Sequence, residues 1–114
     1  MKVKQIERSV DTHLRLLSNR RRRYALACLQ EYGPSIALAD LADEVAVREH
    51  DAPLPAIDER AVLDVYMSLY HSHVPKFVDA GIVEYDQERD LVRIEGVPPL
   101  LERLFGVVEQ DDRP

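Results

Sequence analysis

Four consecutive arginines, residues 20–23, are the part of this sequence best suited to chemistry. They follow Ser18-Asn19, residue types that favour the start of a helix, where positive charges oppose the helix dipole at about 0.3 to 1 kcal/mol each. Bound phosphate would compensate these charges, because helix starts and guanidinium groups both bind phosphate. The alternative is pairing within the chain, with carboxylates such as Asp43 or Glu44. We expect phosphate contact.

A second set of polar residues belongs to the segment 58–80. Its apolar residues recur at helical spacing and predict a buried face made of Val62, Tyr66, Leu69, Tyr70, His73 and Phe77. The opposite face carries Asp64, Ser68, His71, Ser72 and Lys76. Short polar side chains and donors on such a face can read base edges in the major groove of DNA. The alternative is a merely solvated face, since the segment has two basic and four acidic residues.

Charge is divided unevenly along the chain, whose 114 residues carry a formal net charge of -6. Residues 1–33 contain eight basic and three acidic residues, and residues 34–114 contain seven basic and eighteen acidic ones. Because acidic surface repels phosphate, contact with nucleic acid should involve the basic first third. Arginines outnumber lysines by twelve to three, and with the many acidic residues this bias resembles proteins of salt-adapted archaea.

The sequence lacks the residue patterns of disulfide-bonded, metal-binding, catalytic and membrane-spanning proteins. The single cysteine, Cys28, can form no internal disulfide or cysteine metal cage and is expected in the core. His71 and His73 point in different directions on a helix, so no metal or other cofactor is expected. We find no catalytic motif and expect no enzyme. With no apolar run near the roughly 18 residues of a membrane span and no signal-peptide core, we expect a cytoplasmic protein without membrane contact.

Apolar residues at helical spacing predict three helices in the first half of the chain. The N-terminal helix, 1–18, has a stripe made of Val3, Ile6, Val10, His13 or Leu14, and Leu17. The first core helix, 20–32, has an inner face made of Ala25, Cys28, Leu29 and Tyr32 and stops at Gly33-Pro34. The next helix, 38 to about 49, has an inner face made of Leu38, Leu41, Ala42, Val45 and Ala46. An extended loop with two prolines, 50–58, follows it.

The second half begins with a long helix over about 60–79. Pro75 lacks the N–H that would bond to the carbonyl of His71, so we expect a kink or break there and an end at Gly81. Two apolar runs, 82–85 and 91–94, predict a two-stranded hairpin with an acidic turn, in which only Arg89 is placed to contact phosphate. A C-terminal helix, 97–110, has a wide apolar face that a partner surface must bury.

The order helix, short extended piece, helix, long helix and hairpin within residues 20–95 is that of a winged helix-turn-helix. The segments 17–22 (LSNRRR), 40–42 (DLA) and 69–76 (LYHSHVPK) resemble an uncharacterised winged-helix family that is widespread in halophilic archaea. The resemblance covers roughly residues 10–95 and implies a DNA-binding regulator. We therefore predict one domain, 1–114, mainly α with a small β-hairpin wing (α+β), whose core at 19–95 carries extra N- and C-terminal helices.

Together these features predict a protein that binds double-stranded DNA and regulates transcription, with a recognition helix at about 60–79 and a wing at 82–94. The expected DNA contacts are Arg20, Arg21, Arg22, Arg23, Ser68, His71, Ser72, Lys76 and Arg89. We also expect a homodimer through the terminal helices, which could instead pack together within one chain. The alternative function is a protein–protein interaction module without DNA binding, in which the acidic wing and the recognition helix bind a basic partner.

Overall fold

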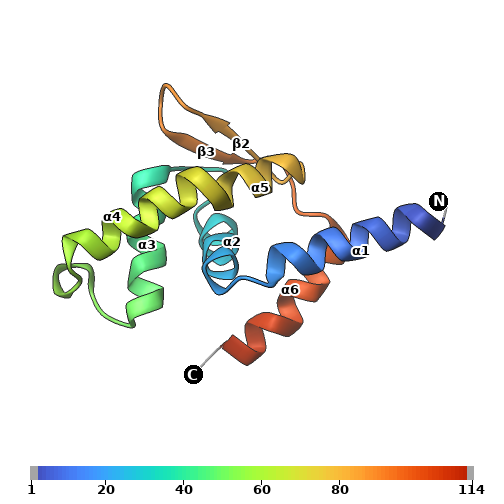
Figure 1. The fold of residues 1–114 in the computed structure, drawn as a ribbon, viewed down its shortest axis with the longest axis horizontal. Helices are drawn as coiled ribbons and strands as arrows, with labels where there is room; N and C mark the ends of the chain where they lie inside the picture. Colours follow the sequence, from blue (N-terminus) through green and yellow to red (C-terminus); the bar gives the residue numbers. More distant parts are fainter. Residues whose placement is uncertain (1–2, 113–114) are drawn as a thin grey trace.

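The computed structural model describes the backbone of residues 3–112 and the side chains of residues 10–109. The fold is mainly helical, with a small antiparallel sheet (Figure 1). The helices are α1 (Val3–Leu17), α2 (Arg20–Tyr32), α3 (Leu38–His50), α4 (Glu59–Ser68), α5 (Val74–Asp79) and α6 (Pro99–Asp112), with a 3-10 turn η1 (Leu54–Ala56) and a π-helical turn η2 (Leu69–His73). The strands are β1 (Ser35–Ala37), β2 (Val83–Asp86) and β3 (Leu91–Ile94). None of the helices described is both long and apolar enough to cross a lipid bilayer.

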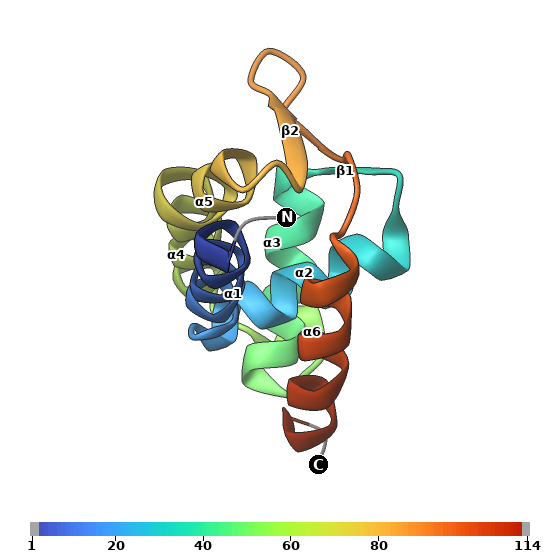
Figure 2. The ribbon, with the colours of Figure 1, turned by 90° about the vertical axis from the view of Figure 1, so that its right-hand side faces the viewer.

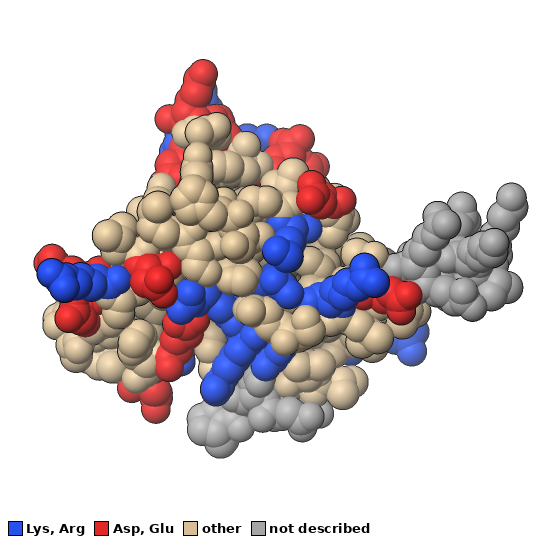
Figure 3. Space-filling model, viewed as in Figure 1, with Lys and Arg blue, Asp and Glu red and all other residues tan. Residues whose placement is uncertain are grey.

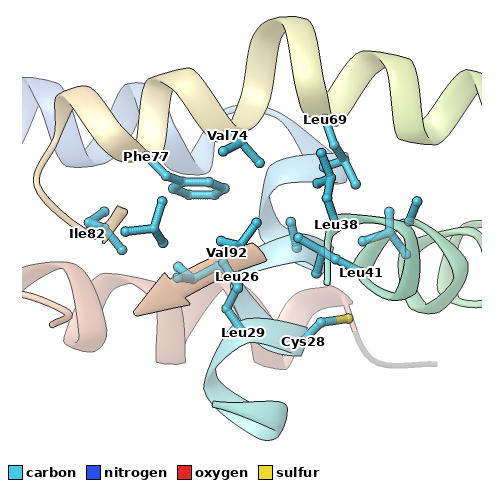
Figure 4. Packing of buried hydrophobic residues seen from close by; sticks show 14 of the residues in the cluster. Leu26, Cys28, Leu29, Leu38, Leu41, Leu69, Val74, Phe77, Ile82 and Val92 are labelled. Carbon is cyan, nitrogen blue, oxygen red and sulfur yellow. The ribbon is translucent and has the colours of Figure 1, made fainter. Parts of the chain in front are cut away.

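The core lies between α2, α3, the sheet and the continuous helix made of α4, η2 and α5 (Figure 4). Each of these elements contributes fully buried side chains, among them Leu26, Leu29, Leu38, Leu41, Leu69, Val74, Phe77 and Val92. The five residues predicted for the inner face of α3 are all buried. In α2 the prediction is wrong at one position, because Tyr32 is 45% exposed at the helix end and Leu26 is buried instead.

Local sequence signals set the helix limits. The side chain of Asn19 accepts a hydrogen bond of 3.1 Å from the backbone N–H of Arg22, which confirms the predicted start of α2. Asp58 caps α4 in the same way, and accepts a bond of 2.8 Å from the backbone N–H of Arg60. After α5 the chain turns at Gly81, whose φ of 74° suits a residue without a Cβ.

The long helix continues through its proline instead of breaking. Helical backbone runs from Glu59 to Asp79, with the π-helical turn η2 in its middle. In this turn the N–H of Val74 donates to the carbonyl of Leu69, five residues back. The wider turn lies directly before Pro75, whose ring and missing N–H disfavour regular α-helical bonding. The predicted break is therefore a π-helical turn, and the helix stays long enough to act as one element.

The wing belongs to a three-stranded antiparallel sheet of order β1-β3-β2, whereas the sequence predicted only a two-stranded hairpin. The additional strand is β1, where Ile36 lies opposite Val92 of β3. The short extended piece predicted between the first two core helices lies here, but three residues are too few to show the alternation that predicts a strand, so the pairing with β3 was not predicted. The order α2, β1, α3, α4 to α5, β2 and β3 is that of a winged helix-turn-helix. The helix α4 to α5 has the position of the recognition helix in that fold, and we call it by this name for its place in the chain order.

The two terminal helices pack against each other within the chain (Figures 1 and 2). The residues buried there include Leu16, Leu17, Leu101 and Phe105. The apolar face of α6 therefore packs against α1 of the same chain. The sequence had left this arrangement open as the alternative to a dimer. Homodimer formation stays a prediction.

Of the two alternatives predicted for the stripe of α1, His13 is the buried one and Leu14 is 50% exposed. Leu17 is buried as predicted, and Leu16, which was not predicted, is buried as well. The predicted stripe residues Val3 and Ile6 lie outside the described side chains. The C-terminal helix begins at Pro99, two residues later than predicted. In the region 50–58, predicted as an extended loop, the chain forms the turn η1.

Cys28 is completely buried, and burial raises the pKa of its thiol to about 11. Because the thiolate is the reactive form, we expect the folded protein to react with a thiol-specific aromatic disulfide at least about 100 times more slowly than the protein unfolded in urea. Absorbance of the released thiolate measures both rates. Comparable rates in the two states would contradict the buried position.

Candidate nucleic-acid interface

The buried guanidinium of Arg22 joins α1, α2 and the recognition helix. Its Nε donates to the carbonyl of Leu16 at 3.0 Å and its Nη2 to the carbonyl of Arg15 at 2.8 Å. These carbonyls belong to the last turn of α1, which carries the negative end of the helix dipole. The carbonyl of Arg15 also accepts hydrogen bonds from the backbone N–H and the hydroxyl of Ser18. The side chain is only 9% exposed, and burial lowers the pKa of Arg22.

The other arginines of this run also have partners within the chain. Arg21 forms a bidentate ion pair with Glu49 of α3 and lies 3.6 Å from Asp64 of α4. The hydrogen bond to Glu49 raises the pKa of Arg21. Arg23 donates to the carbonyl of Leu17 at 2.7 Å. The alternative of pairing within the chain is thus observed for Arg21, but with Glu49 and Asp64 and not with Asp43 or Glu44.

Arg20 is the exposed member of the run. Its guanidinium carbon lies 5.4 Å from the ring centre of Tyr24, which is a cation–π contact. Phosphate contact by the four arginines stays a prediction. The structure shows in addition that Arg22 and Arg23 donate hydrogen bonds to the last carbonyls of α1. These carbonyls stabilise part of the positive charge that the start of α2 would otherwise disfavour.

On the recognition helix, the contact of Arg22 is the imidazole of His73. Its Nδ1 lies 3.4 Å from Nη1 of Arg22, and because a guanidinium only donates, this nitrogen must accept. The imidazole is therefore neutral, with its proton on Nε2. Burial, followed by the charge of Arg22, lowers the pKa of His73 from its ordinary 6.5 to about 4. The prediction that His73 points into the core is confirmed, since 7% of it is exposed.

The outward face of the recognition helix combines polar and apolar side chains. The predicted contacts His71, Ser72 and Lys76 are exposed on it, and Ser68 is half-buried. The side chain of Asp64, predicted on the same face, is exposed but pairs with Arg21. The prediction missed Leu63, Met67 and Val78, which are 58%, 43% and 40% exposed. Leu63 and Met67 are four residues apart and lie outside the predicted apolar face, a signal that was present in the sequence.

A cluster of tyrosines fixes the wing to the recognition helix. The hydroxyls of Tyr66 and Tyr85 both donate to the carboxylate of Asp90, whose φ of 53° turns the chain into β3. The Tyr70 ring packs edge-on against Tyr85, with ring centres 6.0 Å apart, and its hydroxyl accepts a hydrogen bond from Gln87. Burial, followed by the hydrogen bond to Asp90, raises the pKa of Tyr85. The wing is therefore held in place by side-chain contacts as well as by the sheet.

Charged side chains are unevenly distributed on the face shown in Figure 3. Basic side chains gather where α1 and α2 meet below α5, and acidic ones lie on the wing. Residues 58–95, which span the recognition helix and the wing, contain nine acidic and four basic residues. Arg89 is exposed at the wing turn, 3.8 Å from Asp86 and apart from the other predicted contacts. The recognition helix thus lies between a basic flank and an acidic wing.

A family model described as "Domain of unknown function (DUF7344)" matches residues 14–93. The chain belongs to this family. The matched range includes every residue predicted to contact DNA, and it runs from the last turn of α1 to β3. No curated protein and no solved structure gives a match. Within residues 10–109, no group of three His, Cys, Asp or Glu side chains is placed to hold a metal ion.

The tyrosine cluster makes a prediction about stability. Replacing Tyr85→Phe removes one hydroxyl that donates to a carboxylate in a half-buried site, so we expect a loss of about 1 kcal/mol in the free energy of unfolding by urea. The matched control is Tyr32→Phe, because the hydroxyl of Tyr32 reaches Glu44 only at an exposed site. Equal effects of the two changes would contradict a stabilising role of the cluster.

His73 makes a prediction about pH. A neutral His73 in the folded state contributes stability that is fully present above pH 6.5 and is lost as the pH falls toward 4. The free energy of unfolding of the wild type should therefore fall between pH 7.5 and pH 4.5. In His73→Gln we expect this fall to be smaller than in the wild type, by at most about 3 kcal/mol. His71→Gln, an exposed position, is the control and should follow the wild type. A His73→Gln variant with unchanged pH dependence would contradict the buried neutral imidazole.

Proposed function

We propose that this chain binds double-stranded DNA and acts as a regulator of transcription. The observation that carries the proposal is the recognition helix of a winged helix-turn-helix, exposed over two turns where His71, Ser72 and Lys76 lie beside a basic flank. Hydroxyl, imidazole and ammonium groups are suited to base edges and phosphates in the major groove. The resemblance to a winged-helix family of halophilic archaea supports the same function.

The basic flank supplies the positioning contacts in this proposal. Arg20 is exposed at the start of α2, Lys76 is exposed on the recognition helix itself, and Arg21 keeps 23% of its side chain accessible. Contacts to phosphate fix the orientation of a protein on the duplex, whereas contacts to base edges give sequence preference. The acidic wing then lies over the edge of the groove or away from the phosphates, since its charge opposes closer approach.

A protein partner is the second candidate, and a specific surface favours it. Tyr66, Met67, Tyr70 and Tyr85 line a hollow of about 450 Å³ between the recognition helix and the wing. Exposed Leu63 continues this apolar surface, and the acidic residues of the wing border it. Aromatic and methionine side chains are enriched in protein interfaces. A partner for this surface would be a basic segment with apolar side chains.

Variants separate positioning from sequence reading. Replacing all four arginines would also remove the guanidinium groups that bond to the end of α1, so we choose Arg20→Ala and the double variant His71→Ala with Ser72→Ala. Arg103→Ala, an exposed position on α6, is the control. Fluorescence anisotropy with labelled genomic fragments is measured from low to molar potassium chloride.

We expect Arg20→Ala to weaken binding to all fragments alike, by roughly three- to tenfold, and the double variant to change the preference among fragments. The control variant should bind as the wild type does. Absence of binding by folded wild-type protein at every salt concentration would overturn the proposal and favour the protein partner.

A further inference from the structure

A hollow between α1 and α5 gathers positive charge beside the recognition helix. It encloses about 370 Å³, and three basic side chains line it together, Arg15 and Arg22 from the α1–α2 region and Lys76 from α5. Thr12 adds a hydroxyl, and Asp79 is the one carboxylate in its lining. The lining therefore has an excess of positive charge, in a protein whose formal net charge is -6.

The cations of this hollow lack carboxylate partners in the described part of the chain. Arg22 bonds only to the two α1 carbonyls and to neutral His73. Arg15 and Lys76 are exposed and form no ion pair with residues 10–109. By contrast, Arg21 and Arg48 are both paired, with Glu49 and Glu31. Unpaired cations in one hollow favour a bound anion, and a buried guanidinium adds most because its charge is poorly solvated.

We propose that this hollow is a phosphate-binding site, formed by Arg15, Arg22 and Lys76. The phosphate comes either from the backbone of bound DNA, in which case the inference rests on the proposed function, or from a free phosphate ion. In both cases the guanidinium groups donate paired hydrogen bonds to the oxygens and Lys76 provides a point charge. A DNA phosphate here fixes the recognition helix in the groove through α1, an element that lies outside the winged-helix core.

The first measurement uses inorganic phosphate and needs no DNA. Phosphate is titrated against potassium chloride, at constant pH and ionic strength, into ¹⁵N-labelled full-length protein, and amide shifts are followed by NMR. We expect saturable shifts at Thr12, Arg15 and Lys76. Arg15→Ala and Lys76→Ala should each weaken the saturation by roughly three- to tenfold, whereas Arg103→Ala should not. Both test positions are exposed, so folding is maintained, and thermal unfolding of each variant checks this.

The second measurement determines the salt dependence of DNA affinity for the same variants. A lost phosphate contact lowers the slope of log affinity against log salt by about 0.9. Such a decrease in Arg15→Ala and Lys76→Ala, without one in Arg103→Ala, supports a DNA phosphate as the occupant. Saturable phosphate binding with unchanged DNA slopes supports a free phosphate ion as the occupant. Saturable phosphate binding by a protein that binds no DNA at all also supports a free phosphate ion, and it overturns the proposed function. Unchanged slopes together with no saturable phosphate shifts overturn the site.

Discussion

The position of the recognition helix depends on how the charge of Arg22 is accommodated. Its guanidinium has left water for a site in which it bonds to the carbonyls at the end of α1 and to His73. An unpaired buried charge is costly, so these partners must remain in place for the domain to fold. They belong to the end of α1 and to the π-helical turn, and His73 in that turn lies 51 residues after Arg22 in the chain. This one side chain therefore connects the terminal helix α1 to the long helix α4 to α5.

The same contact explains why four arginines are tolerated at the start of α2. The positive end of the α2 dipole follows the negative end of the α1 dipole, and guanidinium groups from α2 bond to the last carbonyls of α1. Glu49 and Asp64 compensate Arg21 on the other side. The arginine run therefore first of all holds α1, α2 and α3 together. Arg20 of the run stays exposed, and with Arg15 of α1 it forms the basic flank.

The recognition helix is positioned on its other side by the wing. Asp90 accepts hydrogen bonds from Tyr66 of the helix and Tyr85 of the strand, and its own carbonyl accepts a bond of 2.8 Å from the N–H of Leu38. The wing, the recognition helix and α3 are joined at this residue. The exposed helix face is therefore held between a basic flank and an acidic wing, and in the proposed function a negatively charged duplex would approach from the basic side.

The features that could be predicted from the sequence are local ones. Asn19 and Gly81 mark helix ends through their own backbone preferences, and the inner face of α3 follows from spacing alone. The strand β1, the pairing of Arg21 with Glu49 and the Arg22–His73 contact depend on residues far apart in the chain, and no spacing rule reports them. Arg15 was missed because its role depends on where α1 docks, although a basic residue in the last turn of a helix was visible.

NMR can test whether DNA binds to the recognition helix beside the basic flank, as we propose. A 20-base-pair duplex is added to ¹⁵N-labelled protein, and the changes in the amide shifts are mapped onto the structure. We expect the largest changes at residues 68–76 and 15–23 and little change at the wing turn, 86–89. Changes confined to the wing or to the far side of α6, or no changes at all, would contradict DNA binding at the recognition helix.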